Sequence, residues 1–228
     1  MSEQMHIRSY QGRPGRMSPR LAEIWAQRGP ELRLPASRWQ LAPVDRVVLE
    51  VGSGMGASVI GLAAAEPSTT VVALDVHVKG LARTIRDADV LGLANVRIFE
   101  GDALIALEDY VPAGSIAAIN VWFPDPWPKR AHHKRRLLRP AFVTAAAGAL
   151  RDGGHLNVAS DIPEYVRWVR DLMRSSGDFR PEGEDGVVPR PTSRSLTKYE
   201  STAHQEGRTV TDLSYRRAAR ADTAAPPG

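Results

Sequence analysis

The sequence predicts an α/β fold in which a mostly parallel sheet carries helices on both faces. Two observations support this prediction. Short apolar runs rich in β-branched residues alternate along the chain with stretches whose apolar residues recur at helical spacing. Strands that alternate with helices in this way typically form a parallel sheet covered on both sides. The length of 228 residues is typical of one domain, or of one domain with extensions.

The predicted elements follow one another in a regular order. A first helix is expected to begin at Ser18 and Pro19, a cap followed by a proline in the first turn, and to end at Gly29 and Pro30. Strands are then expected at residues 47–49, 70–74, 96–99, 116–121, 155–159 and 209–215. Helices are expected between them at residues 57–65, 78–85, 140–150 and 164–173.

This pattern divides the chain into three parts. Residues 1–40 are predicted to form a basic, partly flexible extension with one helix, and residues 41–217 the folded domain. Residues 218–228 are expected to be a disordered tail. Within the domain, residues 183–206 are polar and rich in Gly, Pro, Ser and Thr. So long a loop in a compact domain is more often functional than idle.

Composition limits the kinds of chemistry and location that are expected. The chain has no cysteine, which excludes disulfides, thiolate zinc sites and cysteine nucleophiles. No apolar run approaches the length of a membrane span, and the first residues lack the apolar core of a secretory leader. A cytoplasmic protein without a membrane partner is therefore expected. The net charge of +4 is only a mild basic bias.

A glycine-rich turn follows the first predicted strand. Gly52, Gly54 and Gly56 allow positive φ and a close approach of a ligand to the backbone. Ligands of open α/β sheets bind beyond the carboxyl ends of the strands. Asp75 ends the second strand, 23 residues after Gly52, where an acid can accept both hydroxyls of a ribose. The spacing from Gly52 to Ala57 also matches a dinucleotide fingerprint, so the turn by itself fits either NAD or S-adenosylmethionine.

Three features favour S-adenosylmethionine over NAD. Glu50 precedes the first glycine by two residues, where a carboxylate can face a cationic ligand. The glycines are spaced G-x-G-x-G. Asp102 follows the third strand and is placed to accept a hydrogen bond from an adenine amino group. The alternative is that these residues are ordinary strand-end turns and solvated acids.

The most informative stretch of the chain is a proline-rich corner that follows the fourth strand. Pro124 and Pro126 flank Asp125, and prolines fix both their own backbone and that of the residue before. Three aromatic side chains surround this acid: Trp122, Phe123 and Trp127. Six cations follow within the eleven residues 129–139. We interpret the pair of features as a site where RNA phosphates are held while one base meets one carboxylate.

The alternatives for this region are a rigid loop packed on the core and a solvated helix face. Under the functional interpretation, the predicted RNA contacts are Arg130, His132, His133, Lys134, Arg135 and Arg136. His132 and His133 also form a possible metal pair, but no matching cluster of ligands accompanies them in the sequence. We therefore expect no metal.

The run FPDPWPK at residues 123–129, followed by HHKRR, resembles the signature of the bacterial tRNA (guanine-N(7)-)-methyltransferases. The similarity extends from about Glu50 to Arg216. It implies a Rossmann-like class I methyltransferase fold with a mostly parallel seven-stranded sheet. It also implies transfer of a methyl group from S-adenosylmethionine to N7 of a guanosine in the variable loop of tRNA.

The resemblance implies roles for individual residues. Cofactor contacts are implied at Glu50, Gly52, Gly54, Gly56, Asp75, Asp102 and Asp125. Substrate contacts are implied at Lys129, Asp161, Thr197, Lys198, Tyr199 and Glu200. The central catalytic role falls to Asp125. Two residues depart from the family pattern, since Asp75 stands where Glu is expected and Ser53 where an aromatic residue is frequent.

Asp161 and Glu200 are also candidates on chemical grounds. Guanine offers N1–H and N2–H₂ as paired donors, and one carboxylate can accept both. The alternative for Asp161 is a helix N-cap, and for Glu200 a solvated loop residue.

Other functions remain open from the sequence. One is a methyltransferase that acts on another RNA, a small molecule or a protein, and another is a non-catalytic RNA-binding module. An NAD oxidoreductase lacks an evident proton donor placed for hydride chemistry. The sequence is compatible with a monomer or a homodimer.

Overall fold

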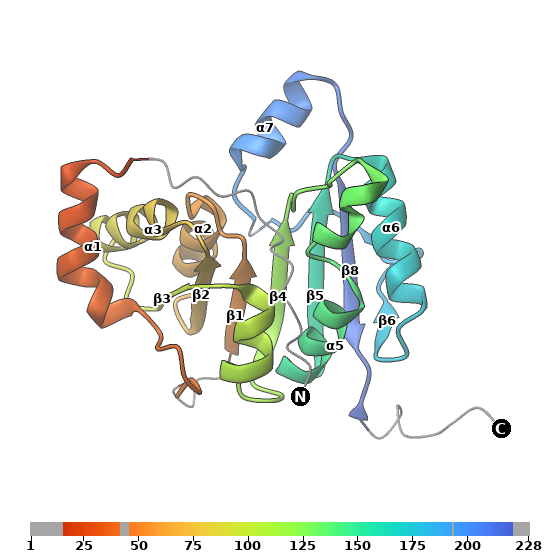
Figure 1. Ribbon diagram of the computed structural model, residues 1–228, viewed down its shortest axis with the longest axis horizontal. Coiled ribbons are helices and arrows are strands. Elements are labelled where there is room, and N and C mark those ends of the chain that lie inside the picture. The colour runs from red at the N-terminus through yellow and green to blue at the C-terminus, as the bar shows by residue number, and fades with distance from the viewer. Residues whose placement is uncertain (1–15, 42–45, 193, 221–228) are drawn as a thin grey trace.

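The computed structural model describes residues 16–41, 46–192 and 194–220. Its centre is an eight-stranded sheet with the strand order β3-β2-β1-β4-β5-β8-β6, in which β7 also pairs with β8. Figure 1 shows this sheet with helices packed along it and α7 lying above the ends of the strands. The expected α/β architecture is therefore confirmed.

Five strands form the parallel part of the sheet. They are β1 (Arg46–Val51), β2 (Thr69–Asp75), β3 (Val96–Glu100), β4 (Ile116–Trp122) and β5 (Leu150–Ser160). The remaining strands, β6 (Phe179–Pro181), β7 (Val187–Val188) and β8 (Thr211–Arg217), run antiparallel to their neighbours. The strand count is one more than the predicted seven. The additional pairing is very short, and a strand of two residues carries no periodic signal in the sequence.

The helices are α1 (Pro19–Leu32), α2 (Ala57–Ala65), α3 (Val78–Val90), α4 (Ala103–Ile105), α5 (Pro140–Ala149), α6 (Pro163–Arg174) and α7 (Lys198–Gln205). Helices α2, α3, α5 and α6 lie close to their predicted positions, whereas α1 ends later than predicted and α4 and α7 were not predicted. The predicted stop of α1 at Gly29 and Pro30 is wrong, because the helix continues through both residues to Leu32. Helix α7 lies in a stretch expected to be a loop. A π-helical turn, η1 (Ala106–Tyr110), and a 3₁₀ helix, η2 (Arg130–Arg135), complete the set.

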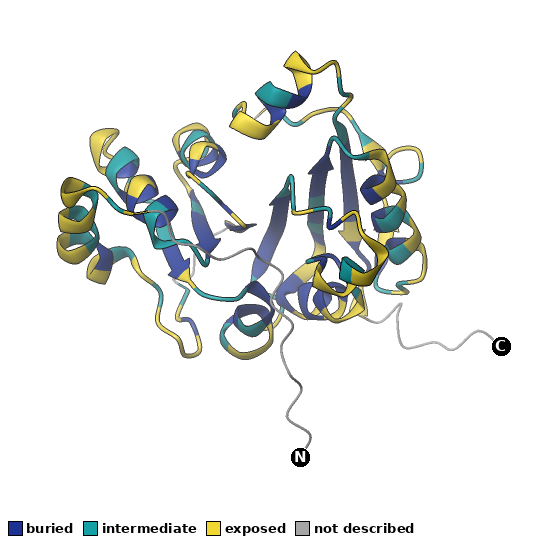
Figure 2. Ribbon diagram, turned by 45° about the horizontal axis from the view of Figure 1, so that its top comes forward, coloured by how far each residue is buried: buried dark blue, intermediate teal, exposed yellow. Residues whose placement is uncertain are grey.

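Both faces of the sheet are buried, as a parallel sheet requires. Along β1, Val47, Leu49 and Val51 pack in one apolar cluster, which also contains residues of α4, α5 and α6. Val48 points the other way, into a second cluster with residues of α2 and α3, and α1 packs against that cluster. Figure 2 shows the buried strands between helices whose outer surfaces are exposed.

The described ends of the chain are packed on the domain. Helix α1 contacts α3, and Trp39 is buried in the larger apolar cluster. At the other end, Ala218 is buried and Arg220 forms an ion pair with Asp152. Most of the predicted tail and residues 1–15 of the predicted extension lie outside the described residues. In the described part of the chain, no helix is long and apolar enough to cross a membrane.

Candidate active site

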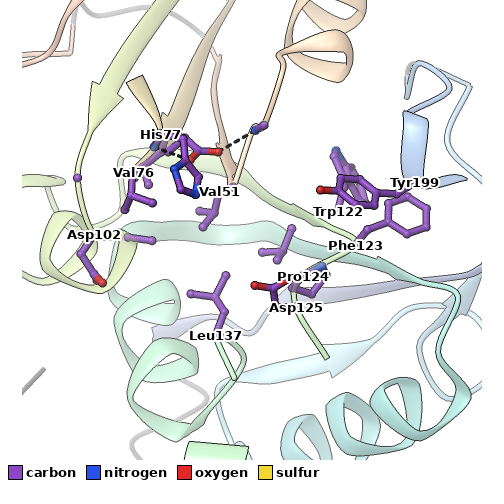
Figure 3. Close-up of a pocket in the computed structure, with 17 residues that line it drawn as sticks. Val51, Val76, His77, Asp102, Trp122, Phe123, Pro124, Asp125, Leu137 and Tyr199 are labelled. Atoms are coloured by element: carbon purple, nitrogen blue, oxygen red, sulfur yellow. Dashed lines mark hydrogen bonds between the residues drawn. The ribbon is translucent and has the colours of Figure 1, made fainter. Parts of the chain in front are cut away.

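A cleft at the carboxyl ends of β1, β2 and β4 has two adjoining chambers. The Asp125 chamber, of about 430 Å³, is lined by Asp75, Asp102 and Asp125 among other residues. The Glu50 chamber, of about 530 Å³, is lined by Glu50, the glycine turn and the start of α7. Figure 3 shows the Asp125 chamber with Asp102 at one end, Phe123 and Tyr199 at the other, and Asp125 between them.

The glycine turn after β1 adopts the backbone that the sequence predicts. Gly52, Gly54 and Gly56 have φ values of 71°, 55° and 81°. A side chain at position 56 would also meet Thr84, since its Cβ would lie 2.1 Å from the hydroxyl oxygen. Gly52 and Gly54 line both chambers. The turn therefore exposes bare backbone to a ligand while it packs tightly on α3.

Asp75 braces this turn from the end of β2. Its carboxylate accepts hydrogen bonds from the backbone N–H of Gly54 and of His77, each at 2.8 Å. An ionised carboxylate has about four acceptor positions, so two bonds leave capacity for a ligand. The side chain lines the Asp125 chamber, where the predicted ribose contact requires it.

Asp102 caps the short helix α4. One carboxylate oxygen, Oδ1, accepts hydrogen bonds from the backbone N–H of Leu104 at 2.8 Å and of Ile105 at 3.4 Å. The same residue lines the Asp125 chamber. Since the cap uses only Oδ1, capping and the predicted adenine contact are compatible.

Glu50 is buried at the end of β1 and lines the Glu50 chamber. Trp122 Nε1 donates a hydrogen bond of 3.1 Å to its carboxylate. Burial raises the pKa of Glu50 to about 7, although hydrogen bonds from Ser58 and Trp122 and the charge of Arg194 act in the opposite direction. A cationic ligand in this chamber would stabilise the ionised form, as the predicted cofactor contact requires.

The corner around Asp125 has an unusual backbone. Phe123 and Trp127 have φ values of 50° and 42°, in the left-handed region that bulky residues rarely adopt, and each precedes a proline. The side chain of Asp125 is exposed at the mouth of its chamber. Partial desolvation raises its pKa, and the charge of His77 opposes that shift. The carboxylate thus lies at the cleft, and its catalytic role stays a prediction.

The prediction that Arg136 contacts RNA is wrong. Its side chain has no exposed surface. The guanidinium donates to the carbonyl oxygens of Pro126 at 2.9 Å and Trp127 at 3.5 Å, and to the carboxylate of Glu164 at 2.7 Å. It also lies over the rings of two aromatic residues of α6, Tyr165 and Trp168. Arg136 therefore holds the Asp125 corner from behind and is not placed to contact RNA.

The other residues of the predicted RNA-contacting strip lie in η2 or next to it, and their side chains differ in exposure and in contacts with aromatic rings. Lys129, Arg130 and Lys134 are exposed. Arg135 is exposed too, but its guanidinium carbon lies 5.0 Å from the centre of the Trp127 ring. The partly buried His132 and His133 pack edge-on against Trp127 and Trp168. The described residues contain no group of acidic and histidine side chains that could hold a metal ion.

The start of α7 contributes to the cleft. Thr197 caps this helix by accepting a hydrogen bond of 3.2 Å from the backbone N–H of Glu200. Thr197, Lys198 and Tyr199 line the Glu50 chamber, and Tyr199 also lines the Asp125 chamber. Three of the four predicted substrate contacts in this segment are therefore at the cleft.

The fourth predicted substrate contact of this segment, Glu200, is not available at the cleft. Its side chain has no exposed surface, and both oxygens accept hydrogen bonds from Arg190 and Arg194 at distances of 2.7 to 3.2 Å. Arg194 also donates to Asp212 on β8 at 3.0 Å. In this structure Glu200 anchors α7 and is not a free acceptor for guanine.

Asp161, after β5, is also paired. Its carboxylate accepts from Arg208 in an ion pair, and its side chain is 12% exposed. The predicted guanine contact at Asp161 stays a prediction, which would require this pair to open.

Sequence reasoning gave no role to Arg194. It lies in an irregular stretch without hydrophobic periodicity, and its buried carboxylate partners are distant enough in the chain to give no local signal. The sequence identifies Phe123 only as one of three aromatic residues around Asp125, because its place at the cleft depends on the backbone at the end of β4.

The sequence is similar to those of known methyltransferases. Residues 45–213 match the protein family described as "Putative methyltransferase". The tRNA (guanine-N(7)-)-methyltransferase of Streptomyces avermitilis is 38% identical over 220 residues, which cover 92% of this chain and 75% of that protein. The enzyme of the same description from Chromohalobacter salexigens is 38% identical over 92% of this chain and 89% of its own length.

The fold resembles that of solved methyltransferases. The crystal structure of the 16S rRNA methyltransferase KamB aligns with a TM-score of 0.57 over 90% of this chain and 95% of that one. The sequence identity is 17%, so this likeness concerns the fold alone.

Proposed function

The chain belongs to the bacterial tRNA (guanine-N(7)-)-methyltransferase family, and we propose that it methylates N7 of a guanosine in the variable loop of tRNA, with S-adenosylmethionine as methyl donor. The observation that carries the proposal is the position of Asp125. Its carboxylate lies at the mouth of a cleft that also holds the glycine turn, Asp75 and Asp102. A tRNA substrate also implies a cytoplasmic location.

The residues of the cleft fit the proposed donor. Glu50 offers a buried carboxylate to a cationic ligand, and the glycine turn lets that ligand lie against backbone. Asp75 and Asp102 have acceptor capacity for ribose hydroxyls and for an adenine amino group. When bound, S-adenosylmethionine supplies an electrophilic methyl group on a sulfonium centre.

The task left to the protein is positioning and electrostatics. Guanine N7 has a free lone pair in the neutral base, so no residue needs to remove a proton before attack. Asp125 orients the base and stabilises the positive charge that develops on it, because a carboxylate lies beside that charge in a partly desolvated site. Arg136 keeps this carboxylate in place through the carbonyl oxygens of Pro126 and Trp127.

The surface beside the corner fits an RNA substrate. N7 lies on the major-groove edge, which side chains reach poorly in A-form RNA, so the target base must come from a loop or be exposed by tertiary structure. The exposed cations Lys129, Arg130, Lys134 and Arg135 adjoin the corner. They are placed to hold backbone phosphates, which positions the tRNA without reading its sequence.

The test is methyl transfer from labelled cofactor to tRNA, followed by mapping of the modified base. The proposal expects 7-methylguanosine at one position in the variable loop. Label at another atom or in another RNA would instead identify a methyltransferase of different specificity. No transfer to any tRNA, with measured cofactor binding, would contradict the proposed function.

A further inference from the structure

Two aromatic rings from different elements face each other at the end of the Asp125 chamber. Phe123 follows β4 directly, and Tyr199 lies in the first turn of α7. Their ring centres are 6.5 Å apart and their planes differ by 21°. Both residues line both chambers, and Figure 3 shows them on the same side of Asp125.

These rings are not ordinary core residues. Tyr199 is 68% exposed, although large aromatic side chains usually bury most of their surface. Phe123 is partly buried and has a φ of 50°, in a region that is unfavourable for a bulky residue. Such backbone strain persists only where surrounding structure holds it, and it occurs frequently at ligand sites.

One buried arginine links the two elements that carry these rings. The guanidinium carbon of Arg194 lies 5.5 Å from the centre of the Phe123 ring and 5.2 Å from that of Trp122. The same guanidinium binds Glu200, the residue next to Tyr199 in α7. Arg194 therefore fixes the end of β4 relative to the helix that carries Tyr199.

We propose that Phe123 and Tyr199 form an aromatic clamp that stacks on the target guanine and presents it to Asp125. This inference rests on the proposed function, because it assumes a purine substrate. Each ring offers a flat apolar face on which a base can stack, and base–aromatic stacking is worth about 1–3 kcal/mol per base. The ring centres lie 6.5 Å apart, and the exposed Tyr199 ring can move outward to admit a base between the two faces.

The test compares Tyr199→Ala with Tyr199→Phe. Because the clamp uses the ring and not the hydroxyl group, Tyr199→Ala is expected to lower kcat/KM for tRNA about ten- to a hundredfold, whereas Tyr199→Phe keeps it within about threefold. Phe123→Leu keeps apolar bulk without the ring and should lose a similar factor. Val90→Ala, at an exposed position at the end of α3, serves as the remote control and should change nothing.

A second measurement does not depend on methyl transfer. In tRNA carrying 2-aminopurine in place of the target guanosine, stacking in the clamp should quench the fluorescence when wild-type protein binds. Tyr199→Ala should leave the probe bright when both protein and cofactor are saturating. This quenching separates stacking from a general structural role of the side chain.

Two results would overturn the clamp. One is wild-type kcat/KM together with wild-type quenching in Tyr199→Ala. The other is an equal loss in Tyr199→Phe and Tyr199→Ala, which would assign the effect to the hydroxyl group. If the wild-type protein fails to methylate N7 of any tRNA guanosine, the proposed function fails, and the fluorescence measurement alone then decides for or against the clamp.

Discussion

The Asp125 corner and the α7 segment flank the cleft, and each is held by one buried arginine. The two arginines bind different types of group. Arg136 holds the Asp125 corner, residues 122–128, through backbone carbonyl oxygens, aromatic rings and the 47% exposed carboxylate of Glu164. Arg194 holds the α7 segment, residues 190–205, through two buried carboxylates, Glu200 and Asp212.

The difference shows what each arginine contributes. Loss of Arg136 would leave unpaired carbonyl oxygens, and the carboxylate of Glu164 can turn to solvent. Loss of Arg194 would remove the ion pair of the buried Asp212 and one of the two arginines that bind the buried Glu200, which is more costly. We therefore infer that Arg136 serves mainly to position the catalytic corner, whereas Arg194 serves both the position of α7 and the stability of the domain.

The largest expected effect is on the methylation rate, when the carboxylate of Asp125 is removed. Asp125→Ala should lower the methylation rate by about a hundred- to a thousandfold or more, because it removes the carboxylate beside the developing charge. Binding of tRNA and thermal stability should be retained, since the side chain is exposed and the cationic surface is intact. Single-turnover rates and tRNA binding isotherms measure the two quantities, and an undiminished rate would refute the role of Asp125.

The next effect tests the α7 segment. Arg194→Met should lower the free energy of unfolding by about 3 to 5 kcal/mol, because two buried carboxylates lose their common partner. Chemical denaturation measures this change. Arg130→Met, at an exposed position, is the matched control and should shift stability by less than about 0.5 kcal/mol. Equal stability of the two variants would remove the distinction drawn between the segments.

The pKa of Glu50 depends on both segments, because Trp122 donates a hydrogen bond to its carboxylate and the charge of Arg194 acts on it. Its pKa of about 7 in the folded protein lies above the ordinary 4.5, so the folded state keeps a proton that the unfolded state has released. The free energy of unfolding should therefore fall as the pH rises from about 4.5 to about 7, by at most about 3 kcal/mol.

Denaturation at pH 5 and pH 7.5 measures this dependence for wild-type protein and for Glu50→Gln. The variant should lack the contribution, because glutamine does not titrate. A pH dependence that is identical in the two proteins would show that Glu50 does not have a raised pKa.

The smallest expected effect separates neighbouring arginines of the strip. Arg135→Met should reduce the slope of log K against log salt concentration for tRNA binding by about one. The reason is that an exposed cation that pairs with a phosphate releases a counterion from the RNA. Arg136→Met should leave the slope unchanged, lower stability by only about 1 to 3 kcal/mol and slow methylation. A reduced slope for Arg136→Met would show that this side chain reaches RNA and would restore the original prediction.

The features that could be predicted from the sequence are those that depend on the spacing of residues along the chain. Acids at the carboxyl ends of parallel strands meet at one edge of the sheet, so Glu50, Asp75 and Asp125 could be placed together without coordinates. Burial of a charge depends on partners that are distant in the chain. Arg136 is buried by aromatic residues of α6, and Glu200 by arginines of a segment without periodicity, so neither could be distinguished from an exposed charge by sequence alone.

The most direct measurement is a structure of the protein with tRNA and S-adenosylhomocysteine, the product of methyl transfer from the proposed cofactor. We expect the guanine of the variable loop in the cleft, with its N7 toward the cofactor sulfur and the carboxylate of Asp125 against the purine. A purine bound elsewhere, or a cofactor away from Glu50, Asp75 and Asp102, would contradict the account.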